Sequence, residues 1–205
     1  MNKMNIAFIL VSAILQVGLF TAIPFVWWLV TARKHQPFLR WLGWKRPVIE
    51  DKKRFYLQLL GIILLFTPVM LFLYVFVDSS DAAVSQFSGH GVSALVPVLI
   101  YSFIQTGLSE EIVFRGFLCK RLSAKTGFFA GNIIQASLFG LMHGALFYSS
   151  VSLYAAIALA IATGGMGWFM GWINEKKAGG SILPSWFIHG FANLASSFAA
   201  MVNII

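Results

Sequence analysis

Six polar residues with the chemistry of a hydrolytic site lie inside apolar stretches of the sequence. They fall in three separate stretches, and they are Glu110, Glu111, Arg115, His143, His189 and Asn193. An ionisable side chain in a lipid-like environment is costly unless it is paired or hydrated, so such residues normally face a bundle interior and mark a functional site. The alternative is a structural polar clamp between helices, and six such residues together favour the site.

The spacing of the first three residues separates two roles. On a helix, Glu111 and Arg115 are four residues apart and share a face, so they can form an ion pair. Glu110 points about 100° away from that face and is left free. Desolvation increases the affinity of a carboxylate for protons. A general base that works near neutral pH needs this higher affinity. We therefore expect Glu110 to be the base.

The histidines and the asparagine can supply the remaining functions of such a site. His189 and Asn193 are also four residues apart, so both can direct donors at one point, as stabilisation of a developing oxyanion requires. His143 can orient a water molecule or share its proton. Gln135 lies two helical turns before His143 and close to its face, where it could line the same cavity.

These residues are positioned by a chain with the composition of a membrane protein. Of its 205 residues, 59 % are hydrophobic and only 11 % are charged, which leaves too little polar surface for a water-soluble globule. Runs of about 20 apolar residues cross a bilayer as helices. The sequence therefore predicts one all-α transmembrane domain over residues 1–205, with six spans at Ile6–Val30, Tyr56–Val77, Gly91–Leu118, Gly127–Tyr148, Val151–Ile173 and Ser181–Ile205.

The basic residues predict the orientation of these spans. Nearly all of them fall in the first, third and fifth links, including Lys120, Arg121 and Lys125 in the third and Lys176 and Lys177 in the fifth. The positive-inside rule places these links in the cytoplasm and both termini outside. This pattern favours a multi-pass protein of a cell membrane, such as a bacterial plasma membrane. The net charge of +8 then reflects contact with membrane lipid, and we expect no nucleic-acid partner.

Two further patterns predict local packing. The first link mixes basic residues with Phe38, Trp41 and Trp44, which suits a short interfacial helix with its rings at headgroup level, although a solvated loop is an alternative. In the fifth span Thr163, Gly167 and Gly171 recur every fourth residue. Such a stripe of small residues lets another helix approach closely, here within one subunit.

The three polar motifs resemble those of a known family of intramembrane peptidases. Glu110-Glu111-x-x-x-Arg115, Phe139-x-x-x-His143 and His189-x-x-x-Asn193 occur in order and in separate apolar spans. The family is the CAAX protease and bacteriocin-processing (Abi) family, related to the Ras-converting CAAX prenyl endopeptidase. The resemblance covers Gly107 to Asn193, within a motif-bearing core of about residues 91–205.

The resemblance implies a function and a role for each motif. It implies an endopeptidase that cleaves membrane-anchored or transmembrane protein substrates, in which Glu110 and His143 activate water. Glu111 and Arg115 brace the first motif, and His189 with Asn193 holds the oxyanion. A metal-dependent alternative, also described for the family, would have Glu110, His143 and His189 bind zinc. We favour the cofactor-free mechanism because no His-Glu-x-x-His motif is present.

Two functions from other classes compete with the peptidase. A small ion-coupled transporter could use intramembrane Glu and His residues to pass protons, although the sequence shows no inverted repeat. A non-catalytic immunity or scaffold protein could keep the same fold. An enzyme should lose its function on Glu110→Gln and keep its fold, whereas the function of a scaffold should not depend on that carboxylate.

Overall fold

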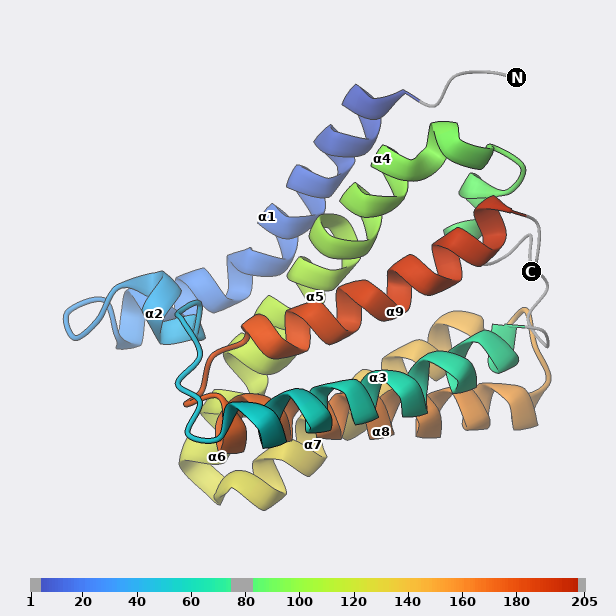
Figure 1. The fold of residues 1–205 in the computed structure, drawn as a ribbon. Coiled ribbons are helices and arrows are strands. Elements are labelled where there is room, and N and C mark those ends of the chain that lie inside the picture. The colour runs from blue at the N-terminus through green and yellow to red at the C-terminus, as the bar shows by residue number, and fades with distance from the viewer. Residues whose placement is uncertain (1–4, 75–82, 203–205) are drawn as a thin grey trace.

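The computed structural model describes residues 5–74 and 83–202, and this part of the chain is helical without any strand (Figure 1). The α-helices are α1 (Ile6–Thr31), α2 (Phe38–Leu42), α3 (Lys52–Tyr74), α4 (Leu95–Leu99), α5 (Ser109–Glu111), α6 (Lys120–Thr126), α7 (Phe128–Phe147), α8 (Leu153–Lys177) and α9 (Leu183–Met201). Shorter 3₁₀ turns are η1 (Ala83–Phe87) and η2 (Gly91–Ala94). The predicted all-α membrane bundle is confirmed.

The central helix runs without a break from Gly91 to Thr126 and is partly π-helical. Segments η3 (Ile100–Leu108) and η4 (Ile112–Cys119) have π geometry, and α5 between them is a short α-helical turn that carries both glutamates. π-helical turns are rare in proteins, and those that are present often lie at functional sites. The helix is therefore irregular on both sides of Glu110 and Glu111.

Helices α1, α2, α7, α8 and α9 pack on this central helix, and α3 packs on α8 and α9 (Figure 1). α9 lies along η3 and also contacts α3, while α7 contacts η4 and pairs with α8 over most of its length. α1 packs on η3, α5 and η4. A core of aromatic and aliphatic side chains from α3, η4, α7, α8 and α9 fills the space between these elements.

The close helix packing predicted for the glycine stripe is confirmed within the chain. A Cβ on Gly167 would lie 3.1 Å from both Arg115 and Phe139, and a Cβ on Gly171 would overlap Asn132. Asn132 in turn donates from Nδ2 to the carbonyl oxygen of Trp168 at 3.0 Å. The stripe therefore brings α8 against α7 and against the Arg115 side chain.

Residues of the predicted first, third and fifth links meet at one end of the bundle. Lys120 Nζ lies 2.5 Å from Glu175 Oε1 and donates to the Gly180 carbonyl oxygen at 2.7 Å. Ser181 Oγ donates to the carbonyl oxygen of Lys45, and the Ile182 N–H donates to that of Gly43. The grouping that the basic residues predicted is thus present in the fold. Which side of a membrane this end faces stays a prediction.

Several predicted boundaries were wrong. The third link is almost absent: Lys120, Arg121 and Lys125 lie on helix α6, and a single residue, Gly127 with φ of 82°, turns the chain into α7. Lys176 and Lys177 likewise lie in the last turn of α8. Basic residues are compatible with a helix C-terminus, where they offset the helix dipole, so charge alone did not mark the ends of these helices.

The first link contains the predicted short helix. In α2, Trp41 and Leu42 are buried against Ile112 and Phe117 of the central helix, and the placement of this helix at headgroup level stays a prediction. Trp44 remains exposed and contacts Trp186 at a ring separation of 5.5 Å. The link is therefore part of the core at this end.

By length and composition, three helical segments of the described residues can cross a membrane: Ile6–Thr31, Gly91–Thr126 and Leu153–Lys177. The predicted spans at Tyr56–Val77, Gly127–Tyr148 and Ser181–Ile205 correspond to α3, α7 and α9, whose ends are Lys52–Tyr74, Phe128–Phe147 and Leu183–Met201. Val77 and Ile205 lie outside the described residues. The count of six spans stays a prediction.

Candidate active site

The first part of the site is a buried network around Glu111. Arg115 Nη1 lies 3.0 Å from Glu111 Oε1, so the predicted ion pair is confirmed, and the two side chains are 1 % and 0 % exposed. His189 Nδ1 from α9 lies 3.0 Å from the same oxygen. Glu111 thus joins the central helix to α9 and holds the His189 ring in one orientation.

The second part of the site brings both histidines to Glu110. His143 Nε2 from α7 and His189 Nε2 from α9 each lie 3.8 Å from Glu110 Oε2. This separation is too long for a direct hydrogen bond, and Oε2 is buried without a partner in the described residues. Glu110 and His143 keep 13 % and 20 % of their side chains exposed, so they are more accessible than the Glu111 network.

In each histidine, the contact made by Nδ1 indicates whether Nε2, the nitrogen that faces Glu110, carries a hydrogen. His143 Nδ1 lies 2.9 Å from the Phe139 carbonyl oxygen, which can only accept, so Nδ1 carries the hydrogen. His189 Nδ1 donates in the same way to Glu111. In the neutral rings both Nε2 atoms are therefore acceptors, as is Glu110 Oε2, so these three neighbouring atoms have no proton donor among them.

Phe139 is a part of this site to which the sequence assigned no role. Its ring lies 4.0 Å from the Arg115 guanidinium carbon, 4.5 Å from the His143 ring and 5.7 Å from the His189 ring. It is fully buried. Its position four residues before His143 was the available signal, because residues at this spacing lie on one helical face.

Asn193 contacts the central helix one turn before Glu110. Its Nδ2 donates to Thr106 Oγ1 at 2.8 Å, and Thr106 precedes Glu110 by one helical turn. Of the six predicted residues, the structure therefore joins Glu110, His143 and His189 in one cluster and Glu111, Arg115 and His189 in a second. Asn193 lies beside them with one amide N–H already in use.

Close backbone contact places α9 against the π-helical segment. A Cβ on Gly190 would overlap the Phe103 ring, and Trp186 Nε1 donates to the Phe103 carbonyl oxygen at 2.7 Å. A Cβ on Gly107 would lie 2.5 Å from the Ser102 carbonyl oxygen and 3.6 Å from Gly190. These contacts fix the depth at which His189 enters the site.

Gln135 does not take the place that its spacing allowed. It is fully buried, and its Nε2 lies 2.8 Å from Asn132 Oδ1 and 3.0 Å from the Gly167 carbonyl oxygen. The Gly167 contact joins α7 to α8, and Asn132, which lies on α7 itself, contacts Trp168 of α8 in turn. Gln135 is therefore a structural link between these helices.

The donor types around Glu110 would suit zinc, which binds imidazole nitrogen and carboxylate oxygen. Each histidine also donates its other ring N–H to an acceptor, as zinc-binding histidines usually do. In the arrangement observed, however, no three His, Cys, Asp or Glu side chains of the described residues are grouped closely enough to hold a metal ion. We therefore derive no reaction step through a metal.

A helical membrane protein with a buried carboxylate and two imidazoles at one point has the features of a membrane-embedded hydrolase. Residues 92–195, about half of the chain, match the family model described as type II CAAX prenyl endopeptidase Rce1-like. The chain belongs to this family, which places it among the CAAX-type membrane proteases. Neither a curated protein nor a solved structure matches the chain significantly.

Proposed function

We propose that the protein is an intramembrane endopeptidase that hydrolyses peptide bonds of membrane-associated substrates. The observation that supports this most is the placement of two imidazole Nε2 atoms, each 3.8 Å from Glu110 Oε2. A water molecule that bridges these atoms would donate to Glu110 and to His143. Family membership supports the peptidase class, and the residue roles below are part of the proposal.

In the proposed reaction, Glu110 removes one proton from water, while His143 accepts a hydrogen bond from the second hydrogen, which stays on the oxygen, and so orients that oxygen. The oxygen bonds to the substrate carbonyl carbon, and the carbonyl π electrons move to its oxygen. Collapse of this tetrahedral intermediate breaks the C–N bond, and the amine leaves with the proton that Glu110 had taken. Glu110 is thereby restored as a carboxylate.

The oxyanion would be stabilised by His189 and Asn193. Because His189 Nδ1 is committed to Glu111, Nε2 can donate only when the ring carries both protons. The Glu111 carboxylate lies 3.0 Å from His189 Nδ1 and is placed to stabilise that charge, and Arg115 pairs with the same carboxylate oxygen. Asn193 has a second amide N–H besides the one that it donates to Thr106.

A comparison of membrane proteomes tests this function and does not require an identified substrate. Membranes that contain the wild-type protein should accumulate new C-termini of membrane-associated proteins, and membranes with Glu110→Gln should not. The matched control is Gln86→Glu, the reverse exchange at an exposed position of η1, which should leave the new termini in place. If Glu110→Gln retains its fold and the wild-type set of termini, the scaffold function becomes the better explanation.

The orientation of the protein is a second part of this proposal. With both termini outside, the end that holds Lys45, Lys120 and Lys177 faces the cytoplasm, as its basic charge favours. Reporter fusions after Arg54 and after Gly89 should then report opposite sides of the membrane. The same side for both would contradict the six-span topology.

A further inference from the structure

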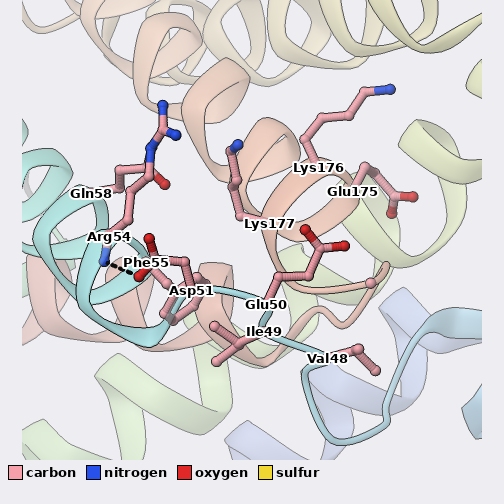
Figure 2. Close-up of a pocket in the computed structure, with 11 residues that line it drawn as sticks. Val48, Ile49, Glu50, Asp51, Arg54, Phe55, Gln58, Glu175, Lys176 and Lys177 are labelled. Atoms are coloured by element: carbon pink, nitrogen blue, oxygen red, sulfur yellow. Dashed lines mark hydrogen bonds between the residues drawn. The ribbon is translucent and has the colours of Figure 1, made fainter.

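A cavity that is separate from the active site lies where the first and fifth links meet. Its volume is about 300 Å³, and it lies between the chain before α3, the first turns of α3 and the end of α8 (Figure 2). None of the six predicted site residues lines it. Its walls carry both positive and negative side chains.

The cavity is lined by three cations, Arg54, Lys176 and Lys177. Within residues 5–74 and 83–202, no ion pair involves any of them; the Lys176 ammonium lies 4.6 Å from the centre of the Phe128 ring, and that of Lys177 lies 5.5 Å from the centre of the Trp172 ring. Glu175, which also lines the cavity, is paired with Lys120 instead. The charges of Arg54 and Lys177 are therefore available for an anion.

The same cavity also offers acceptors. The carboxylates of Glu50 and Asp51 lie across from Arg54 and Lys177 in Figure 2. Asp51 uses Oδ1 to accept the Arg54 backbone N–H at 3.0 Å, and the buried Oε1 of Gln58 accepts no hydrogen bond from the described residues. An unsatisfied buried acceptor is costly, so a ligand that also supplies N–H donors would complete this side.

The position of the cavity favours a ligand from the membrane. Helix α8, one of the three segments able to cross a bilayer, ends at Lys177, and α3 begins at Lys52. Basic pockets between helices at such ends bind lipid headgroups. On α3 the face of Arg54 and Gln58 continues through Gly61 and Leu65, where a Cβ on Gly61 would meet nothing and Leu65 is exposed, so an acyl chain has a free apolar surface to follow.

We propose that this cavity binds the headgroup of an aminophospholipid such as phosphatidylethanolamine. The phosphate accepts charge-assisted hydrogen bonds from Arg54 and Lys177, and the primary ammonium donates to Glu50 and Gln58. A choline headgroup has no N–H to donate. A glycerol headgroup brings no positive charge to the carboxylates.

Native mass spectrometry of the purified full-length protein tests the proposal. The protein is incubated with an equal mixture of phosphatidylethanolamine, phosphatidylglycerol and phosphatidylcholine that share the same acyl chains. We expect preferential retention of phosphatidylethanolamine. Arg54→Ala with Lys177→Ala should lower that retention about tenfold, the effect of losing one or two charge-assisted hydrogen bonds. Glu50→Gln with Asp51→Asn should bring phosphatidylethanolamine down to the level of phosphatidylcholine, and Asn still caps α3.

The matched control is Arg46→Ala with Lys125→Ala, which removes the same charge at exposed positions outside the cavity. It should retain lipid like the wild type, and every variant should keep the wild-type thermal transition. If the Arg54→Ala, Lys177→Ala double variant loses that transition, the milder single variant Arg54→Gln replaces it and should also retain less phosphatidylethanolamine than the wild type. Equal retention of the three lipids by the wild type, or an equal loss in the control, would overturn the proposal. Binding of inorganic phosphate as tight as that of the lipid would make the cavity a free-phosphate site.

Discussion

The central helix and α1 are both long and apolar, yet they use their polar residues differently. In the most apolar stretch of α1 only 11 % of residues are buried, against 28 % in the most apolar stretch of Gly91–Thr126. The central helix carries Glu110, Glu111 and Arg115, and side chains of α7 and α9 surround them: His189 contacts Glu111, Phe139 lies against Arg115, and both histidines lie near Glu110. α1 contributes one amide, Gln16, which contacts Gln105 and Ser109 of the central helix.

This difference shows where the fold is sensitive to change. Around Glu111 the helices are joined by charges and by glycines that allow no larger side chain, so a substitution there breaks several contacts at once. On α1, most side chains face outward and have no partner to lose. The following variants test this contrast, beginning with the largest expected effect.

The largest effect is expected from Arg115→Leu. It leaves the Glu111 carboxylate buried without its guanidinium partner, which should reduce the free energy of unfolding by about 3–5 kcal/mol. Thermal unfolding in detergent measures this, with Arg33→Leu on the exposed first link as the control. Equal stability of Arg115→Leu and the wild type would show that the ion pair does not hold the central helix.

A matched pair of glycine substitutions compares the two regions directly. A Cβ on Gly171 would overlap Asn132, whereas a Cβ on Gly18 of α1 would meet nothing within 4 Å. Gly171→Ala should therefore cost about 1–3 kcal/mol of stability, and Gly18→Ala should be neutral or stabilise by up to about 1 kcal/mol. The contrast between the regions fails if both variants shift the thermal transition by the same amount.

The smallest effect is expected from Gln16→Leu. It removes the amide contacts of α1 to Gln105 and Ser109, and hydrogen bonds between membrane helices contribute about 0.6 kcal/mol each. Gln105→Leu should give a similar loss, and the double variant should lose less than the two single losses added together, because they share one contact. Full additivity would show that the two amides act independently.

Much of the site could be predicted because it depends on residue type and on helical spacing. The Glu111–Arg115 pair follows from a separation of four residues, and the meeting of Glu110 with His143 and His189 follows from the cost of isolated polar groups in lipid. The bond from His189 to Glu111 could not be predicted. It depends on the rotation of α9 against the central helix, which no pattern within one segment specifies.

The parts of the fold that were missed have similar causes. An apolar run has the same composition in α and π geometry, so η3 and η4 could not be recognised from the pattern. Tryptophan is typical of interfacial positions, but Trp41 is buried because α2 packs against Phe117 of the central helix, a contact between distant segments. The charge of Lys120 predicted a link between helices. In the fold Lys120 lies on a helix, where its ammonium contacts Glu175 and the Gly180 carbonyl oxygen.

The most direct test of the central claim is the cleavage rate of a substrate peptide by the purified protein in lipid vesicles. We predict that Glu110→Gln lowers kcat by about 10²–10⁴-fold, the contribution of a general base, and that chelators leave the wild-type rate unchanged. The Gln86→Glu variant should cleave at the wild-type rate. Wild-type activity in Glu110→Gln would contradict the assignment of Glu110 as base. Activity that is lost to a chelator and restored by stoichiometric zinc would instead make Glu110, His143 and His189 metal ligands.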